Sequence, residues 1–249
     1  MRIFTVILLA LALTGCGARS TSPDVTRVLG AKAQRCAAGE LKPLGTARTA
    51  YVGVARHGAV ALRRPAGTVE ARFGRRNVNG YPTLFGVVGK VVRADCTPRW
   101  YRVQLPLKPN GSTGFVRAQA LQVQTVAVRI VVDLSEKRLT LFRGGRRTLV
   151  AAVAVGSPST PTPTGRFYVN QRLVPTDTRG PYGPGAIGIS AFSNVLTGWA
   201  QGGPIAIHGT NEPWSIGRAV SNGCIRLPNA TLEKVFRLAV AGTPVIITA

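Results

Sequence analysis

Histidine, methionine and acidic residues are all scarce in this 249-residue chain. It contains two His (His57 and His208), one Met and nine Asp plus Glu, against 32 Lys plus Arg. So few histidines argue against a zinc site rich in His, and we expect no metal ligand set. Hydrophobic residues make up 45% of the chain and charged residues only 16%. That balance excludes a solvated disordered tail and a long coiled coil.

The shortage of acids leaves a formal net charge of +23. An excess of this size favours anionic surroundings, such as cell-wall polymers or acidic lipid head groups. No basic helix, zinc ligand set or aromatic-interleaved RNA motif accompanies the charge, so nucleic acid is not the expected partner. Solvated arginine-rich surfaces are an alternative explanation for much of the excess.

Glycine and proline, in contrast, are abundant, with 29 Gly and 17 Pro. Such a composition is typical of short strands joined by turns rather than of helix bundles. The length suits one large domain or two small ones, each able to bury a core. The expected fold class is therefore mainly β.

The N-terminus has the pattern of an export signal. The short cationic start is followed by the apolar run Ile3–Leu13, which is too short for a bilayer span of about 20 residues. The run leads into Leu13-Thr14-Gly15-Cys16, which resembles the bacterial lipobox. The resemblance implies a signal peptide at residues 1–15 and lipidation of Cys16, which would anchor the exported chain to the outer face of the bacterial cell membrane. An ordinary signal peptide with a chance cysteine is the alternative.

Two further cysteines, Cys36 and Cys96, have no other assigned role. An oxidising compartment would allow them to form a disulfide. Their spacing in the sequence does not establish that their Cα atoms approach closely enough, so the pairing stays open here.

Two β domains are expected after a tether at residues 16–47. Residues 48–125 form the first, with strands near 51–54, 59–62, 83–88, 100–105 and 114–116. The Trp-containing stretch Trp100–Leu105 followed by Thr113–Val116 resembles the end of a bacterial Src-homology-3-like barrel. That resemblance implies wall binding or substrate positioning, while a simple spacer remains an equal alternative.

Residues 127–248 form the second domain. Its expected strands lie near 129–134, 138–142, 148–155, 167–169, 187–189, 204–207 and 244–248. Leu232, Val235, Phe236 and Ala239 recur at helical spacing within Asn229–Ala239, which predicts one late helix. We therefore expect a mostly β domain with no nucleotide-binding unit.

One histidine and one cysteine in this domain have the surroundings of a reactive pair. His208 ends an apolar strand, and Gly223 immediately precedes Cys224 and permits a tight backbone turn. A nearby imidazole can accept the thiol proton and lower the thiol pKa, which makes Cys224 the candidate nucleophile and His208 the candidate base. The Gly223 and Cys224 amides are candidate oxyanion donors, and Arg226 could bind a substrate carboxylate.

The segments around this pair resemble a known family. They read His208-Gly209-Thr210-Asn211 and Ser221-Asn222-Gly223-Cys224-Ile225-Arg226-Leu227, with Thr162-Pro163-Thr164-Gly165 upstream. This pattern, from Ala127 to Thr248, is similar to the L,D-transpeptidase catalytic domain of bacterial cell-wall enzymes. The resemblance implies a β-sandwich-like fold, peptidoglycan stem peptides as substrate and no cofactor. Cys224 would attack the carbonyl of the third stem residue and release D-alanine, and an amine of another stem would resolve the thioester as a 3→3 cross-link.

Several neighbouring residues are expected to line the substrate site. They are Ser221, Asn222, Gly209, Thr210 and Tyr182, together with Arg226. Many family members carry His two positions before the cysteine, whereas this chain has Asn222, so His208 is the expected base. Ser221 could order the turn or orient His208 by hydrogen bonding, and Tyr182 could line the cleft from a Gly/Pro loop.

Other classes are compared by residue order and spacing. Sortase-like enzymes also place His before Cys but much further apart than the sixteen positions here, and cell-wall cysteine peptidases usually reverse the order. A non-enzymatic wall-binding lipoprotein, in which Cys224 is unreactive, is the alternative from a different class. We expect a monomer, and the sequence leaves the acyl acceptor and the third stem residue (diaminopimelate or lysine) open.

Overall fold

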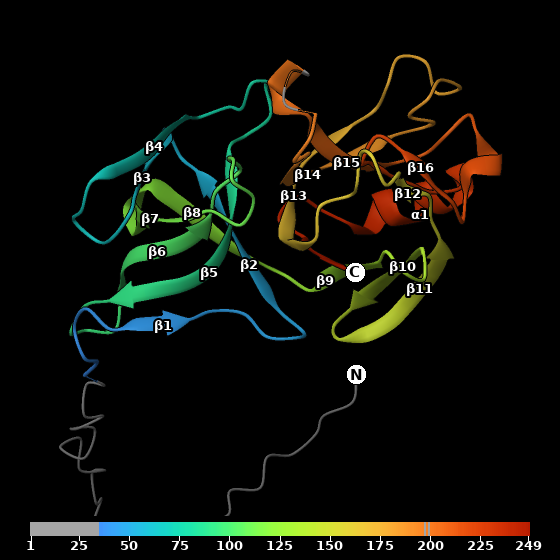
Figure 1. The fold of residues 1–249 in the computed structure, drawn as a ribbon. Helices are drawn as coiled ribbons and strands as arrows, with labels where there is room; N and C mark the ends of the chain where they lie inside the picture. Colours follow the sequence, from blue (N-terminus) through green and yellow to red (C-terminus); the bar gives the residue numbers. More distant parts are fainter. Residues whose placement is uncertain (1–34, 197, 199) are drawn as a thin grey trace, which may run out of the picture. The chain divides into compact units, whose positions relative to one another are not determined.

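The structure is a computed structural model that describes residues 35–196, 198 and 200–249, and residues 34–249 form one compact unit. Two eight-stranded sheets follow one another along the chain (Figure 1). The strands of the first are β1 Leu41–Pro43, β2 Ala50–Ala55, β3 Gly58–Leu62, β4 Val69–Gly74, β5 Leu84–Val92, β6 Pro98–Gln104, β7 Thr113–Arg117 and β8 Leu121–Val126. The predicted signal peptide and Cys16 lie outside the described residues.

The first sheet, which we call the N-terminal β domain (residues 41–126), has the strand order β4-β3-β7-β6-β5-β2-β8, with β1 paired to β5. Alternating residues of its strands bury an apolar core that includes Phe85 and Val103. Cys36 and Cys96 form a disulfide with a Cα–Cα distance of 5.1 Å. Within the stretch predicted as a tether (16–47), Cys36 is joined to this sheet by the disulfide, and β1 pairs with β5.

The second sheet, the C-terminal domain (residues 128–248), has the order β11-β10-β9-β18-β13-β14-β15-β17. Its strands are β9 Val128–Asp133, β10 Arg138–Arg143, β11 Arg146–Ala152, β13 Gly165–Leu173, β14 Ala186–Phe192, β15 Pro204–His208, β17 Ile225–Arg226 and β18 Pro244–Thr248. The last strand returns to the middle of the sheet, parallel to β9 and antiparallel to β13. This closure brings the β-rich core together around Ile130, Val132 and Ile247, all of which are buried.

Two short strands, β12 Val155–Gly156 and β16 Ala219–Ser221, pair in parallel as a separate ladder. The sequence predicted one strand over 148–155, but β11 ends at Ala152 and the chain then leaves β10 to reach β16. The predicted helix is present as α1, Asn229–Leu238, with Leu232 and Val235 buried. Single turns of 3-10 helix lie at η2 Ala118–Ala120, η3 Ala200–Gly202 and η4 Pro213–Ser215. Within the described ranges, no helix is both long and apolar enough for a transmembrane span.

The two domains contact each other through buried and polar groups. Tyr168 of β13 is 1% exposed and donates its hydroxyl to the Leu84 carbonyl of the N-terminal β domain at 2.9 Å. Asn110 exchanges two hydrogen bonds with the Phe192 backbone, at 2.7 and 2.9 Å. Each of these bonds satisfies a polar group that would otherwise lose water at the contact. The N-terminal β domain is therefore packed against the sheet that carries the predicted site.

Candidate active site

His208 is held rigidly at the end of β15. Ile205 and Ile207 of this strand point into the core, so Ala206 and His208 face the opposite side of the sheet. The His208 residue is 5% exposed, and β15 is paired with β14 on one side and β17 on the other. The prediction that the ring emerges at the end of an ordered strand matches this placement.

Cys224 lies in a tight turn directly before β17. Gly223 has φ +105°, a left-handed conformation that favours glycine. The Ser221 hydroxyl spans the turn, because it accepts the Gly223 N–H at 3.1 Å and donates to the Cys224 carbonyl at 2.6 Å. Ser221 therefore orders the turn, one of the two roles predicted for it. The Gly223 N–H is already bonded in this state, which leaves the Cys224 N–H as the candidate oxyanion donor.

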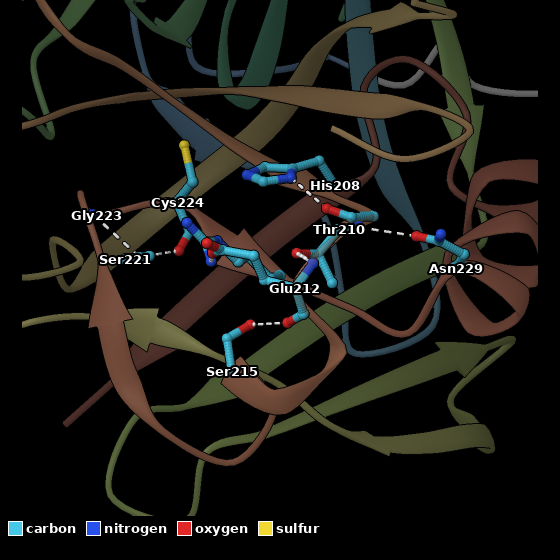
Figure 2. Close-up of polar contacts among 10 residues, drawn as sticks. His208, Thr210, Glu212, Ser215, Ser221, Gly223, Cys224 and Asn229 are labelled. Atoms are coloured by element: carbon cyan, nitrogen blue, oxygen red, sulfur yellow. Dashed lines mark hydrogen bonds and ion pairs between the residues drawn. The ribbon is translucent and has the colours of Figure 1, made fainter. Parts of the chain in front are cut away.

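The two predicted reactive side chains lie beside each other, His208 at the end of β15 and Cys224 in the turn before β17 (Figure 2). The register of β15 and β17 pairs His208 with Arg226, so Cys224 lies beside the strand that carries His208. The His208 Nδ1 is 2.5 Å from the Gly209 carbonyl oxygen. A carbonyl only accepts hydrogen bonds, so Nδ1 carries the proton and Nε2 presents a lone pair. Figure 2 shows this second ring nitrogen on the side of Cys224.

Burial keeps both members of the pair uncharged. The pKa of His208 is lowered to about 4, mainly by desolvation. The Gly209 carbonyl bond opposes this shift, and the Arg226 charge adds to it. Burial raises the pKa of the Cys224 thiol, against smaller opposing effects of the Ala206 backbone and Arg226. The sequence predicted a thiol pKa lowered by the imidazole, and that expectation was wrong because the pair is desolvated. The resting state is a neutral thiol beside a neutral imidazole.

Arg226 is present at the site but already has a partner. Its guanidinium forms an ion pair with the Glu212 carboxylate, and the two side chains are 19% and 43% exposed. Binding of a substrate carboxylate by Arg226, as predicted, therefore requires sharing or exchange of Glu212. In the structure, the charge of Arg226 favours the thiolate form of Cys224. Glu212 was missed by the sequence analysis, since a loop carboxylate fourteen positions before an arginine gives no periodic signal.

Gly209 and Thr210 continue from β15 and support the His208 ring. Gly209 supplies the carbonyl to Nδ1, and the Thr210 N–H donates to the Asn229 side-chain oxygen at 2.8 Å. Asn229, the first residue of α1, was not predicted as a site residue. Its place five positions after Cys224, at the start of the helix, was the available signal.

Tyr182 and Asn222 lie at the margin of the site. The Tyr182 ring is edge-to-face with the His208 ring, at a centroid distance of 5.0 Å, and Tyr182 is 48% exposed. Its loop comes close, because a Cβ on Gly183 would be 2.9 Å from the Gly209 Cα. Asn222 is exposed beside the cysteine turn. Among the predicted substrate residues, Tyr182 thus contacts the candidate base itself.

Two threonines in the loop after β12 form hydrogen bonds to the backbone of the cysteine turn. The Thr162 hydroxyl accepts the Gly156 N–H at 2.8 Å and donates to the Gly223 carbonyl at 2.9 Å. The Thr160 hydroxyl donates to the Ser221 carbonyl at 2.9 Å. These two threonines fix the turn on the face away from His208, a function that the sequence analysis did not assign. Within the described parts of the chain, no cluster of three or more His, Cys, Asp or Glu could hold a metal ion.

Comparison with known proteins identifies the family of the C-terminal domain. Residues 127–247 match the family model of the L,D-transpeptidase catalytic domain, YkuD. The chain is 34% identical over 149 residues to YkuD of Bacillus subtilis (strain 168), a protein named as an L,D-transpeptidase, and the match covers 57% of this chain and 83% of that protein. The chain belongs to the L,D-transpeptidase family.

A second relative and a solved structure cover different shares of their chains. ErfK/SrfK of Salmonella typhimurium (strain LT2), named a probable L,D-transpeptidase, is 33% identical over 158 residues, which cover 57% of this chain and 51% of that protein. The crystal structure of L,D-transpeptidase 3 from Mycobacterium tuberculosis aligns with a TM-score of 0.41 and 17% identity, over 61% of this chain and 79% of that chain.

Proposed function

We propose that the protein is a peptidoglycan L,D-transpeptidase that joins two stem peptides through a thioester on Cys224. The observation that carries the proposal is the bond from His208 Nδ1 to the Gly209 carbonyl, which leaves Nε2 free to accept a proton on the side of Cys224. A buried, neutral pair of this kind suits proton transfer that accompanies attack on a carbonyl.

The first half-reaction acylates the cysteine. Cys224 Sγ attacks the carbonyl of the third residue in a tetrapeptide stem while its proton passes to His208 Nε2. The Cys224 N–H is placed to stabilise the oxyanion. The peptide bond to the terminal D-alanine then breaks, the leaving amine takes the proton from Nε2, and the acyl group stays on sulfur as a thioester.

The second half-reaction transfers the acyl group. An amine on the third residue of another stem attacks the thioester carbonyl and gives its proton to His208. The carbon–sulfur bond breaks and the thiolate is reprotonated, which leaves a 3→3 cross-link and the free enzyme. The ion pair between Arg226 and Glu212 keeps the positive and negative charges beside the sulfur balanced during both half-reactions.

The proposal places the protein in the cell envelope, where the stem peptides are found. The lipobox-like Leu13–Cys16 supports export and a lipid anchor at Cys16, and the net charge of +23 favours an anionic wall and membrane surface. Palmitate labelling that is lost in Cys16→Ser would establish the anchor. A monomer suffices for this chemistry, since both proposed catalytic side chains come from one domain.

The decisive experiment incubates the chain from residue 17 onward with disaccharide-tetrapeptide and follows the products by mass spectrometry. The expected products are free D-alanine, an acyl adduct on Cys224 and cross-linked dimers. Cys224→Ala must abolish all three, while its circular dichroism matches the wild type. A folded wild-type protein that neither releases D-alanine nor forms an adduct with the substrate or with a carbapenem would instead be a non-enzymatic wall-binding protein.

A further inference from the structure

A cavity lies between the two domains, and its lining does not include the cysteine turn. It encloses about 560 Å³ and is lined by both the N-terminal β domain and the strands β13, β14 and β15. Cavities of this size at domain contacts are common binding sites for small ligands and peptides. The chemistry of its lining indicates what it can hold.

Three cations face this cavity without an acidic neighbour. Arg72, Arg76 and Lys108 are among its lining residues, and no Asp or Glu is. Of the ion pairs in the described part of the chain, none involves these three side chains. Arg76 donates one hydrogen bond to the Gly80 carbonyl. Cations without an acidic partner around a partly enclosed space attract carboxylates, because the low-dielectric walls strengthen the field.

The opposite wall presents amide groups. Gln171 accepts hydrogen bonds from the side chains of Asn77 and Asn79, each at 3.0 Å, so these amides are already ordered. Asn170, in contrast, has a buried side-chain oxygen with no partner in the described structure, while its nitrogen donates to the Ile189 carbonyl at 3.3 Å. A buried acceptor without a donor costs free energy, which a ligand N–H at this point would recover.

The cavity and Cys224 share one face of the sheet. A β-bulge between Val169 and Gln171 turns Gln171 away from the core. From there the register runs Gln171 to Gly188 to Ala206, and Ala206 lies beside Cys224 in β15 and β17. Three strand spacings of about 4.8 Å place Gln171 about 14 Å from Cys224.

The residues between the cavity and the thiol are small. Gly188 has no side chain, and a Cβ there would be 2.7 Å from the Gln171 Cγ and 3.0 Å from the unpaired Asn170 oxygen. Ala206 follows in the same row. Gly188 is buried, because the Gln171 and Asn170 side chains cover it, so a peptide that extends from the cavity towards the sulfur must pass over these two side chains.

We propose that this interdomain cavity binds the acceptor stem peptide, with its carboxylates at Arg76 and Lys108 and a peptide N–H at the Asn170 oxygen. The inference rests on the proposed function, and it adds a site for the second substrate at a distance from the thioester. Peptide amides and carboxylates are the groups that this lining recognises, and the cavity lies on the same face of the sheet as Cys224, at a distance that an extended stem peptide can span.

The test separates acylation from transfer. With disaccharide-tetrapeptide as both donor and acceptor, hydrolysed tripeptide and cross-linked dimer are counted from one reaction. Asn170→Leu keeps the approximate volume and removes the acceptor oxygen. Arg76→Gln combined with Lys108→Gln removes two charges. Lys234→Gln combined with Arg237→Gln is the matched control, because it removes the same charge from exposed positions on α1.

The expected result is selective loss of transfer. Both cavity variants should acylate Cys224 within about twofold of the wild-type rate, while the ratio of dimer to tripeptide falls about tenfold or more, in line with a lost hydrogen bond to a charged or buried group. The α1 control should keep the wild-type ratio. Raising the concentration of acceptor should restore dimer formation in the charge variant.

Several outcomes would overturn the inference. A dimer-to-tripeptide ratio within twofold of the wild type in both folded cavity variants would show that the acceptor binds elsewhere. An equal fall of the dimer-to-tripeptide ratio in the α1 control would mean that net charge alone causes the effect. A wild type that acylates but only hydrolyses the thioester would mean that the cavity binds no acceptor stem. If the wild type does not acylate at all, the proposed transpeptidase function itself is wrong, and the inferred acceptor site, which rests on that function, is wrong as well.

Discussion

Ser221 offers the sharpest test of how the cysteine turn is held. Its hydroxyl bonds both the Gly223 N–H and the Cys224 carbonyl, and the residue is 1% exposed. In Ser221→Ala these two backbone groups lose their partner. Each unpaired buried group costs about 1–3 kcal/mol. Because Cys224 is only partly buried, water can reach its carbonyl. We therefore expect the free energy of unfolding to fall by about 2–4 kcal/mol in total.

The same change should slow the chemistry. A displacement of the sulfur by about 1 Å can cost a hundredfold in rate, so acylation by a carbapenem should slow by about 10- to 100-fold. Urea denaturation gives the stability, and intact-mass kinetics give the acylation rate. Ser112→Ala is the matched control, because Ser112 is only partly buried and its hydroxyl donates one solvent-exposed hydrogen bond, to the Pro109 carbonyl.

The two readouts can refute different parts of this reasoning. Stability within about 0.5 kcal/mol of the wild type, the usual effect of a surface change, would mean that the two bonds contribute nothing. A destabilised variant with an unchanged acylation rate would mean that Ser221 supports the fold without positioning the thiol.

Two further predictions concern charge at the site, and a third concerns packing between the two domains. The neutral imidazole is the proposed base, and the pKa of His208 is about 4. The acylation rate, measured between pH 3.5 and 8, should therefore be constant down to about pH 5 and should decline below about pH 4. A midpoint near pH 6.5 would contradict the buried, neutral ring. Glu212→Gln leaves the Arg226 charge unbalanced, so the pKa of the nearby thiol should fall, as measured by thiolate absorbance against pH, and an unchanged or higher value would disprove the coupling. Gly242→Ala should lower the free energy of unfolding by about 2–4 kcal/mol, because its Cβ would be 2.4 Å from a β2 side chain at φ +86°. Gly111→Ala, with φ +85° and nothing within 4 Å, isolates the backbone cost, and an equal loss in both variants would exclude the contact.

Local patterns predicted the parts of the site that lie on regular elements. The apolar run before His208, the glycine before Cys224 and the helical spacing after Asn229 are each set by short stretches of chain. The structure has β15, the tight turn and α1 at these places. The mainly β fold follows from the same alternation of buried and exposed residues.

What the sequence could not supply depends on contacts between distant segments. The Glu212–Arg226 pair forms only when the loop after β15 closes over β17. The raised pKa of the Cys224 thiol results from burial by several elements together, so the pairing of residue types alone gave the wrong direction. The bulge at Val169–Gln171 shifts the face of two residues, and no residue pattern in β13 marks it.

The uncharged state of the resting pair has a consequence for the lifetime of the enzyme. Thiolates attack peroxides and small disulfides, whereas a protonated, largely buried thiol reacts with these reagents slowly. Disulfides such as Cys36–Cys96 generally form in oxidising surroundings, where such reagents occur. In the proposed mechanism, Cys224 is thus spared from premature oxidation to sulfenic acid, and its sulfur becomes nucleophilic only when the thiol proton passes to His208 during attack on a bound carbonyl.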